Sequence, residues 1–450
     1  MKPTGLVFFP AFDWAISPTH PEREERLLYT RDQLFEEGFM DLPSIREYQP
    51  RLATARDIAR THFCIPAPFD QATEAHRISC GGALVIADAV LSGEVKNGFA
   101  LVRPPGHHSM RVSHGNRGFC NINNEAIMVD YIRKTYGLRK IAIVDTDVHH
   151  GDGTQDIFWH DPNVLFISFH QDGRTLYPGS GFVDELGGPL APGMTLNIPL
   201  PPGTTDKGIL RVLDELVLPI LHEFQPEVII NSAGQDNHFS DPLANMRFTA
   251  RGYAELNRRL APDIAVLEGG YSVETALPYV NMGIIMAMAG IDDSNLYEPE
   301  LPAGGFAESE SLMKALDGVI AELQAIWANR DRLVTAARAK YDTFFQRRKS
   351  IYYDTDGISE MQTETVRMCP DCAGYLTIES RDQAHIGGVP PVYCISVPFH
   401  ACRQCREDAL DLYARMKAGR ERLTNLYLQD QSTDTHLRYN VREGKEIVFE

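Results

Sequence analysis

Acidic and histidine side chains gather at four places along the chain, each directly after a short apolar run. These places hold His107 and His108, then Asp145, Asp147, His149 and Asp152, then Asp236, and finally Glu268 and Tyr271. Ligand sites in open parallel sheets lie outside the carboxyl ends of the strands, so the four clusters are expected to meet. One Asp-x-Asp or His-His pair is more often a capped turn or a surface pair, but four at successive strand ends favour one site.

The segment VDTDVHHGDG (144–153) places Asp145, Asp147 and His149 at alternate positions. Alternation along an extended segment puts side chains on one side of the backbone. Two ligands from this segment and Asp236 give one imidazole and two carboxylates, which leaves open the fourth position that a catalytic zinc needs for water. Zinc in such a site lowers the pKa of water towards neutrality, so the pattern indicates a metal-dependent hydrolase.

Six motifs resemble those of the histone deacetylase family and stand in the family's order. They are RPPGHH (103–108), GFCNINNEAI (118–127), DTDVHHGDG (145–153), YPGSG (177–181), NSAGQD (231–236) and EGGY (268–271). An earlier segment, SPTHPEREERL (17–27), is similar to another family motif, and the resemblance runs to about residue 290. It covers close to two thirds of the chain.

The resemblance implies a role for each residue of the clusters. The catalytic zinc ligands would be Asp147, His149 and Asp236. His107 and His108 would face the attacking water, with His108 the better candidate for general base and acid. Asp145 would orient His107 and Asp152 would orient His108, because a carboxylate fixes the tautomer and basicity of an imidazole.

The resemblance also implies how substrate is held. Tyr271 would donate a hydrogen bond to the substrate carbonyl and stabilise the oxyanion. Phe119 and Tyr177 match the aromatic walls of a narrow tunnel for an acylated lysine side chain. Further substrate-binding positions would be Gly118, Leu243 and Gly270.

A potassium ion lies beneath the zinc in the family. By resemblance its ligands here would be the side chains of Asp145, Asp147 and Ser168 and the backbone carbonyls of His149 and Phe169. Ser168 taken alone would more often be a strand serine that is satisfied by the backbone.

The chain departs from the family at the pocket rim. Gln235 stands where the family more often has an apolar residue, and Asn237 and His238 follow the metal-binding Asp236 directly. Leu243 stands where polyamine-specific relatives carry a glutamate, which disfavours a polyamine substrate. A rim carboxylate elsewhere, such as Asp70 or Glu74, could serve the same cation.

The elements that must position these residues are short apolar runs separated by helical stretches. The predicted strands are LVFFP (6–10), GFALVRPP (98–105), KIAIVDTDVHH (140–150), NVLFISFH (163–170), PEVIINSAG (226–234) and DIAVLEGGY (263–271). Continuous apolar runs indicate strands buried on both faces. Helix-spaced apolar residues predict covering helices within 78–93, 124–137, 209–224 and 249–260. We expect a doubly wound, mainly parallel α/β sheet with helices on both faces, similar to arginases and deacetylases.

The C-terminal third has a different pattern. Residues 308–350 are helical in period after a Ser-rich cap signal and predict a closing helix or helical pair. CPDC (369–372) and CRQC (402–405), with strand-like segments between them, predict a zinc ribbon held by Cys369, Cys372, Cys402 and Cys405. Cys394 is expected to be a buried strand residue. The tail beyond the ribbon is helical in period and locally basic.

These patterns predict four parts of the chain. A deacetylase catalytic domain covers residues 1–305, closing helices and a linker cover 306–358, the ribbon covers 359–412, and a tail covers 413–450. The ribbon lies outside the resemblance, so a structural cap, a dimer contact and a docking surface all stay open as its purpose.

The charge composition limits the classes of molecule that the protein is expected to bind. The formal net charge of −18 over 450 residues disfavours direct nucleic-acid binding and favours cationic partners, although surplus acid also keeps a protein dispersed. The apolar run near the N-terminus is short and suits a first strand better than a signal peptide. We expect a cytoplasmic protein with no membrane association, and a homo-oligomer stays open.

Three functions fit the sequence. The first is a zinc-dependent hydrolase that removes an acyl group, most simply acetyl, from a lysine of a peptide or protein. The second is an amidohydrolase of acetylpolyamines or other small N-acyl amines. The third, an inactive acyl-lysine-binding scaffold, is disfavoured because Tyr271, both histidines and all three zinc ligands are present.

Overall fold

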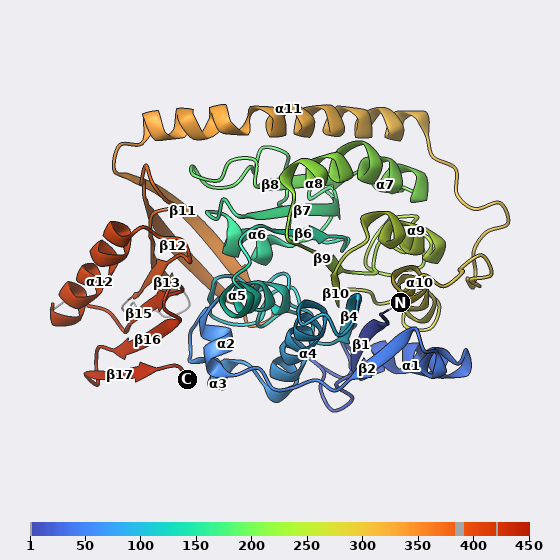
Figure 1. The fold of residues 1–450 in the computed structure, drawn as a ribbon, viewed down its shortest axis with the longest axis horizontal. Helices are drawn as coiled ribbons and strands as arrows, with labels where there is room; N and C mark the ends of the chain where they lie inside the picture. The colour runs from blue at the N-terminus through green and yellow to red at the C-terminus, as the bar shows by residue number, and fades with distance from the viewer. Residues whose placement is uncertain (1, 383–390, 420–421) are drawn as a thin grey trace.

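The computed structural model describes residues 2–382, 391–419 and 422–450. Eight strands form one sheet: β1 Thr4–Phe9, β2 Ile45–Tyr48, β4 Asn97–Val102, β6 Ile141–Asp145, β7 Val164–Gln171, β8 Thr195–Leu200, β9 Val228–Ala233 and β10 Ile264–Leu267. Their order is β2-β1-β4-β10-β9-β6-β7-β8, and every pair is parallel (Figure 1). The predicted parallel α/β sheet is confirmed.

Helices cover both faces of this sheet. One face packs against α2 Ala55–Ala59, α4 Glu74–Leu91, α5 Asn124–Tyr136 and α6 Asp152–Phe158. The other packs against α1 Leu28–Glu36, α7 Asp206–Val212, α8 Leu218–Phe224, α9 Ala250–Leu260 and α10 Leu277–Ala289. Short elements complete this part: η1 Glu24–Leu27, η2 Phe39–Asp41, η3 Leu213–Val217, α3 Pro68–Gln71, β3 Phe63–Cys64 and β5 Val112–Ser113.

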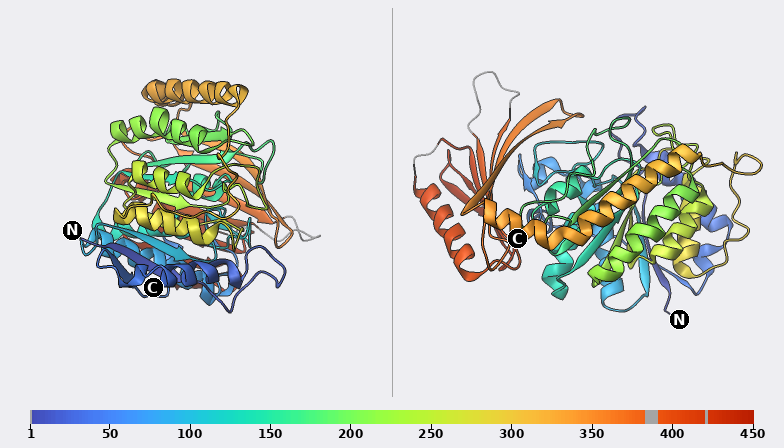
Figure 2. Two further views of the ribbon diagram at one scale, coloured as in Figure 1. Left: turned by 90° about the vertical axis from the view of Figure 1, so that its right-hand side faces the viewer. Right: turned by 90° about the horizontal axis from the view of Figure 1, so that it is seen from above.

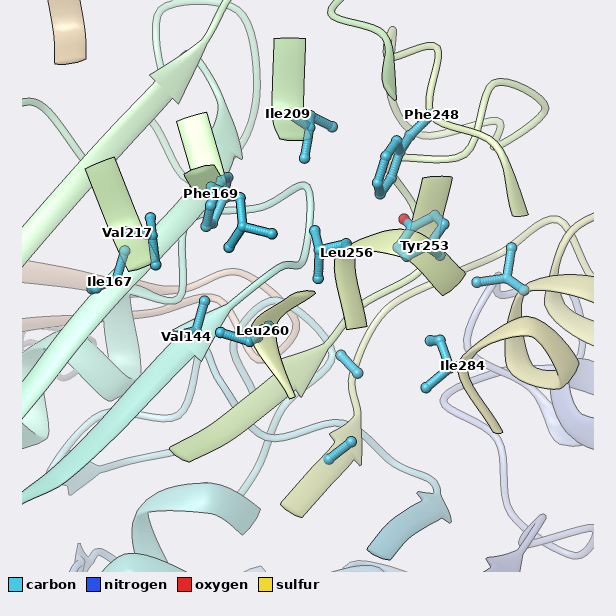
Figure 3. Close-up of a cluster of buried hydrophobic side chains, with 14 of the residues drawn as sticks. Val144, Ile167, Phe169, Ile209, Val217, Phe248, Tyr253, Leu256, Leu260 and Ile284 are labelled. Carbon is cyan, nitrogen blue, oxygen red and sulfur yellow. The ribbon is translucent and has the colours of Figure 1, made fainter. Parts of the chain in front are cut away.

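The apolar strand runs divide their side chains between two cores. In β6, Ile141 and Ile143 enter the core on the α4 side, whereas Ala142 and Val144 enter the core on the α9 side. Figure 3 shows the second core, where Val144 lies near Leu260. When successive residues of a strand are buried on both faces of the sheet, apolar and polar residues do not alternate along it. This is why these strands appear in the sequence as continuous apolar runs. Each fully buried aliphatic side chain contributes about 2 kcal/mol.

One long helix, α11 Glu310–Lys340, crosses the α7–α8 side of the molecule (Figures 1 and 2). The Ser309 hydroxyl caps it by accepting a hydrogen bond from the Leu312 amide at 3.2 Å. The helix predicted over 308–350 is wrong beyond Lys340, because the next ten-residue element, Phe344–Tyr353, is strand β11. Burial alternates along β11, so its period is two rather than 3.6.

Seven strands form a second sheet in chain order. They are β11, β12 Ile358–Arg367, β13 Leu376–Asp382, β14 Val392–Val397, β15 Asn425–Asp430, β16 Thr435–Asn440 and β17 Lys445–Val448. The β14–β15 pair is parallel and the others are antiparallel. Helix α12 Arg403–Ala418 packs on β14 and β15. The predicted ribbon and tail therefore share one sheet with β11, and the tail that reads as helical becomes strands from Asn425 onward; residues 383–390 of the ribbon and 420–421 of the tail lie outside the described residues.

The second sheet packs on the α/β domain at the two-stranded β3–β5 pair, through a mixed apolar and polar interface. Phe63 and Val112 share a core with Ile378 and Tyr427, and the Tyr427 hydroxyl donates to the Cys64 carbonyl at 3.0 Å. The β11–β12 hairpin, orange in Figure 1, runs from the second sheet towards the centre of the molecule. Within the described ranges, no helix has both the length and the hydropathy to cross a bilayer.

Candidate active site

Three predicted zinc ligands come together beyond the carboxyl ends of β6 and β9. One ligand atom each from Asp147, His149 and Asp236 lies within 4.8 Å of the others. His149 Nδ1 is 3.1 Å from Asp147 Oδ1 and 3.1 Å from Asp236 Oδ2. Both carboxylates are fully buried, and His149 is 9% exposed. The alternation along VDTDVHHGDG thus places its side chains as predicted.

The donor set fits a zinc ion. One imidazole nitrogen and two carboxylate oxygens are the ligands of a catalytic zinc with an open position. In the described part of the chain no Lys or Arg pairs with Asp147 or Asp236, so two buried negative charges lack an ionic partner other than histidine. A cation offsets the cost of burying them. A Cβ on Gly269 would lie 2.2 Å from Asp236 Oδ2, so only glycine leaves room for these carboxylates there.

The two histidines after β4 stand beside this group. His107 Nδ1 lies 3.1 Å from Asp145 Oδ2, and His108 Nδ1 lies 2.8 Å from Asp152 Oδ1. Both predicted dyads are thus brought together, and in each the carboxylate favours a proton on Nδ1 and leaves Nε2 to face the site. Burial, followed by the positive charge of His107 and then Arg117, holds the pKa of His108 well below its usual value.

Tyr271 lines the same cavity as His108 and His149. Its amide donates to Asp241 Oδ2 at 2.7 Å, while Asp241 Oδ1 accepts from the Leu243 amide at 2.9 Å. Asp241 therefore fixes two residues of the predicted pocket at once. Burial raises the pKa of the Tyr271 phenol well above its ordinary value, so the phenol keeps its proton and can donate a hydrogen bond.

A cavity of about 250 Å³ leads to these groups. It is lined by His108, Gly118, Phe119, His149, Leu176, Tyr177, Leu243, Tyr271 and Asp354. Four of the five predicted substrate-binding residues are in this lining; the fifth, Gly270, offers its carbonyl to Arg26 Nε at 2.8 Å instead. A Cβ on Gly118 would lie 2.4 Å from His108 Cδ2, so a glycine is needed for the wall to approach the histidine.

The unusual residues around Asp236 have structural partners. Gln235 Nε2 donates to Asn281 Oδ1 at 2.5 Å, the Asn237 amide donates to the Tyr253 hydroxyl at 3.0 Å, and His238 Nε2 lies 2.8 Å from Glu298. None of the three lines the cavity as far as the structure is described. Their polarity therefore serves buried hydrogen bonds behind the site.

Two residues hold the site from behind: Glu268, which the sequence placed in the last cluster without a role, and Arg26, which the sequence did not single out. Glu268 Oε2 accepts from the amides of Gly106 and His107 at 2.7 and 3.0 Å, which fixes the histidine loop. Arg26 donates to the carbonyls of Gly270 and Glu268 and pairs with buried Glu22. Burial, then the neighbouring Glu125 carboxyl, raises the pKa of Glu268 well above its usual value. The apolar-run pattern gives no signal for Arg26, because the two carbonyls to which it donates lie more than 240 residues away.

The residues of the predicted potassium site also lie together. The Asp147 amide donates to Asp145 Oδ1 at 3.1 Å, and Asp145 pairs in register with Ser168 on β7. Ser168 is fully buried with its hydroxyl 2.9 Å from His170 Nδ1, and Phe169 follows it in the same strand. The potassium assignment stays a prediction.

The four cysteines of the predicted ribbon form a second metal-competent group. One Sγ atom each from Cys369, Cys372, Cys402 and Cys405 lies within 4.8 Å of the others, and the Cys369–Cys402 separation is 3.8 Å. Cys402 caps α12 by accepting from the Cys405 amide at 3.5 Å. Cys394 lies apart, fully buried in β14 as expected. Four thiolates at this spacing suit a tetrahedral structural zinc.

Known proteins share these features. Residues 66–284 match the histone deacetylase domain. A probable deacetylase of Archaeoglobus fulgidus is 47% identical over 329 residues, which cover 66% of this chain and 89% of that protein. The polyamine deacetylase HDAC10 of Mus musculus is 40% identical over 215 residues, covering 46% of this chain and 32% of that protein. The crystal structure of the HDA15 HD domain superposes with a TM-score of 0.63 and 28% identity over 75% of this chain and 98% of its own.

The matched domain spans the strand ends that carry the His107–His108 pair and the Asp147–His149–Asp236 group, whereas the second sheet lies beyond it. Because nearly the whole archaeal deacetylase aligns at 47% identity, this chain belongs to the histone deacetylase family of hydrolases.

Proposed function

We propose that this protein hydrolyses the side-chain amide of an acylated lysine, most simply acetyl-lysine, in a peptide or protein. One observation carries the proposal: a cavity walled by Phe119, Tyr177 and Leu243 leads to the Asp147–His149–Asp236 group. Such walls bury the methylenes of a lysine side chain, and the polar peptide backbone can stay outside.

The chemistry follows from the residues around the cavity floor. Zinc held by Asp147, His149 and Asp236 would supply Lewis acidity to the amide carbonyl and to water. His108, oriented by Asp152, takes a proton from the water that adds to the carbonyl carbon. Tyr271 donates a hydrogen bond to the carbonyl oxygen as negative charge develops there. When the C–N bond breaks, the proton on His108 passes to the leaving lysine nitrogen, which gives a free amine and a carboxylate.

Two further ions complete the proposal. A structural zinc would be held by Cys369, Cys372, Cys402 and Cys405, and a potassium ion would lie near Asp145 and Ser168. Neither takes part in the reaction steps above. The cytoplasmic location remains a prediction.

An acetylpolyamine amidohydrolase is the second candidate. The mouse relative is named a polyamine deacetylase, and the carboxylate of Asp354 lines the cavity, although the predicted rim carboxylates Asp70 and Glu74 do not. Against this candidate, Leu243 presents an apolar wall inside the cavity, where a second cationic nitrogen would be desolvated.

Competition kinetics decide between the two. An acetyl-lysine peptide and acetylspermidine are mixed in one tube with the purified chain, and release of both amines is followed by mass spectrometry. We expect the peptide to have the higher kcat/KM. A clear preference for acetylspermidine would reverse the ranking, and hydrolysis of neither would refute the proposed function.

A further inference from the structure

The second sheet contributes one residue to the cavity. Asp354 stands at the turn between β11 and β12 and lines the cavity beside Phe119, Tyr177 and Leu243. Its Oδ1 accepts from the Gly118 amide at 3.0 Å and from the Tyr177 hydroxyl at 3.3 Å. Residue 354 lies 70 residues beyond the matched domain, which ends at residue 284.

The hairpin turn is fixed against the catalytic domain. The buried Tyr353 hydroxyl donates to the Val112 carbonyl at 2.6 Å, and Asp356 Oδ2 accepts from the Asn116 amide at 2.6 Å. His114 Nε2 lies 2.8 Å from the Ser380 hydroxyl on β13. Contacts on both sides of Asp354 thus hold its carboxylate at the mouth of the cavity.

The charges of Arg117 and His20 act on Asp354 without forming an ion pair with it. Neither carboxylate oxygen forms an ion pair, and Oδ2 has no hydrogen bond, within the residues that the structure describes. The Arg117 guanidinium forms its ion pair with Asp152 instead, at 2.5 Å. The His20 ring packs edge-on against the Phe119 ring, with the two centroids 4.3 Å apart. Burial lowers the pKa of His20 and so favours the neutral imidazole. Asp354 therefore presents a carboxylate at the mouth whose Oδ2 is free of the hydrogen bonds that hold Oδ1.

We propose that Asp354 is a specificity-determining residue, whose carboxylate binds a cationic nitrogen of the substrate at the mouth of the cavity. The inference rests on the proposed function and narrows its substrate class. A short alkyl chain separates the scissile amide from the α-ammonium group of a terminal acetyl-lysine, and a similar chain separates it from the next nitrogen of an acetylpolyamine. Either nitrogen would meet Asp354 while the amide reaches Tyr271 and His108.

The test compares three acetylated amines that share the scissile bond. They are an acetyl-lysine amide with a free α-ammonium group, the same compound with that nitrogen acetylated, and acetylspermidine. The measured quantity is the ratio of kcat/KM for each cationic substrate to that for the blocked one. Asp354→Asn should lower the ratio about fivefold, as expected for a partly exposed ion pair. The matched control, Asp342→Asn, changes an exposed carboxylate just before β11 that does not line the cavity, and it should keep the wild-type ratio.

The substrate whose ratio falls identifies the source of the cation. A fall for the lysine compound alone assigns Asp354 to peptides, and a fall for acetylspermidine alone assigns it to polyamines. An equal loss of kcat/KM on all three substrates would overturn the inference, because a residue that only shapes the cavity wall affects charged and uncharged substrates alike.

The kcat/KM ratio of the wild type must also decrease as the ionic strength rises. This second measurement keeps the inference testable if Asp354→Asn does not fold. Cleavage of the blocked compound by the wild type separates failure of the inference from failure of the proposed function.

Discussion

Tyr271 illustrates how a motif residue depends on parts of the chain that its motif does not contain. Asp241 holds its amide, and the Arg26 guanidinium lies 4.9 Å from its ring centroid. The ring meets Phe119 edge to face with centroids 5.6 Å apart. These contacts come from three distant segments, so the phenol is held in one place before substrate arrives, which is the condition for an effective oxyanion donor.

Tyr271→Phe should lower kcat by about a hundredfold or more, because one oxyanion donor is typically worth about 3 kcal/mol. Zinc content should not change, since no ligand of the Asp147–His149–Asp236 group is altered. Steady-state kinetics and elemental analysis of the same preparation check both statements. Wild-type turnover in this variant would mean that another group polarises the carbonyl.

The sequence predicted the pocket residues that belong to a recognisable motif. It did not predict those that reach the pocket only through tertiary contacts. Phe119, Tyr177 and Leu243 were expected in the pocket and line the cavity. Asp354 was missed because nothing in the segment around it distinguishes a pocket residue from a surface turn. Only the pairing of β11 with β12 and the docking of their turn on residues 112–118 bring it to the site.

Among the secondary-structure elements, continuous apolar runs predicted strands correctly, whereas segments that mix apolar and polar residues did not. β6 and β10 bury every side chain and were predicted. β8 was missed because Asn197 and Pro199 interrupt its apolar run. β11 read as helix because FFQRRKSIYY follows a long helical pattern and its centre consists of good helix formers. Pairing with β12 overrides that preference.

A part-buried ion pair contributes to the docking of the second sheet at the C-terminal end of α2, and removal of this pair should change how stability depends on pH. Asp434 Oδ1 accepts from Arg60 Nε at 2.6 Å and lies 3.0 Å from His436 Nε2. Burial alone would raise the pKa of Asp434, but the hydrogen bonds from His436 and Arg60 outweigh burial and hold that pKa well below its usual value. The pair therefore stabilises the fold above the unfolded-state pKa of about 4 and loses its effect as the pH falls further.

Asp434→Asn should reduce the free energy of unfolding by about 2 kcal/mol at neutral pH, as expected for a hydrogen bond to a charged group. The difference from the wild type should shrink as the pH falls below about 4, because the wild-type carboxylate is then progressively protonated. Unfolding curves at a series of pH values measure this difference. A difference that stays constant or grows in acid would contradict the assigned role.

At the scale of the whole molecule, the second sheet is both a metal-competent module and part of the active-site wall. The four-cysteine group lies at the Cys402 end of α12, and Asp354 lies at the turn of the β11–β12 hairpin. The sequence predicted the thiolate group from its spacing but not the sheet around it, because several of the strands are short and polar. The four predicted parts of the chain remain predictions.

Elemental analysis should find about two zinc ions per chain, since the thiolate group and the carboxylate–imidazole group are chemically independent. Cys372→Ser combined with Cys402→Ser should leave one zinc and lower the midpoint of thermal unfolding. Cys394→Ser is the matched control, because Cys394 is a buried cysteine outside the group. Two zinc ions in the double variant would refute the structural site.

The central claim is that the Asp147–His149–Asp236 group supports hydrolysis of acetyl-lysine through zinc. Acetate release from an acetyl-lysine peptide is measured with the full chain as purified, after removal of metal by a chelator, and after zinc is added back. We expect release by the zinc-loaded chain, loss to background after chelation, recovery with zinc, and no recovery in Asp236→Ala. Undiminished release by Asp236→Ala, or no release by the zinc-loaded wild type, would contradict this claim.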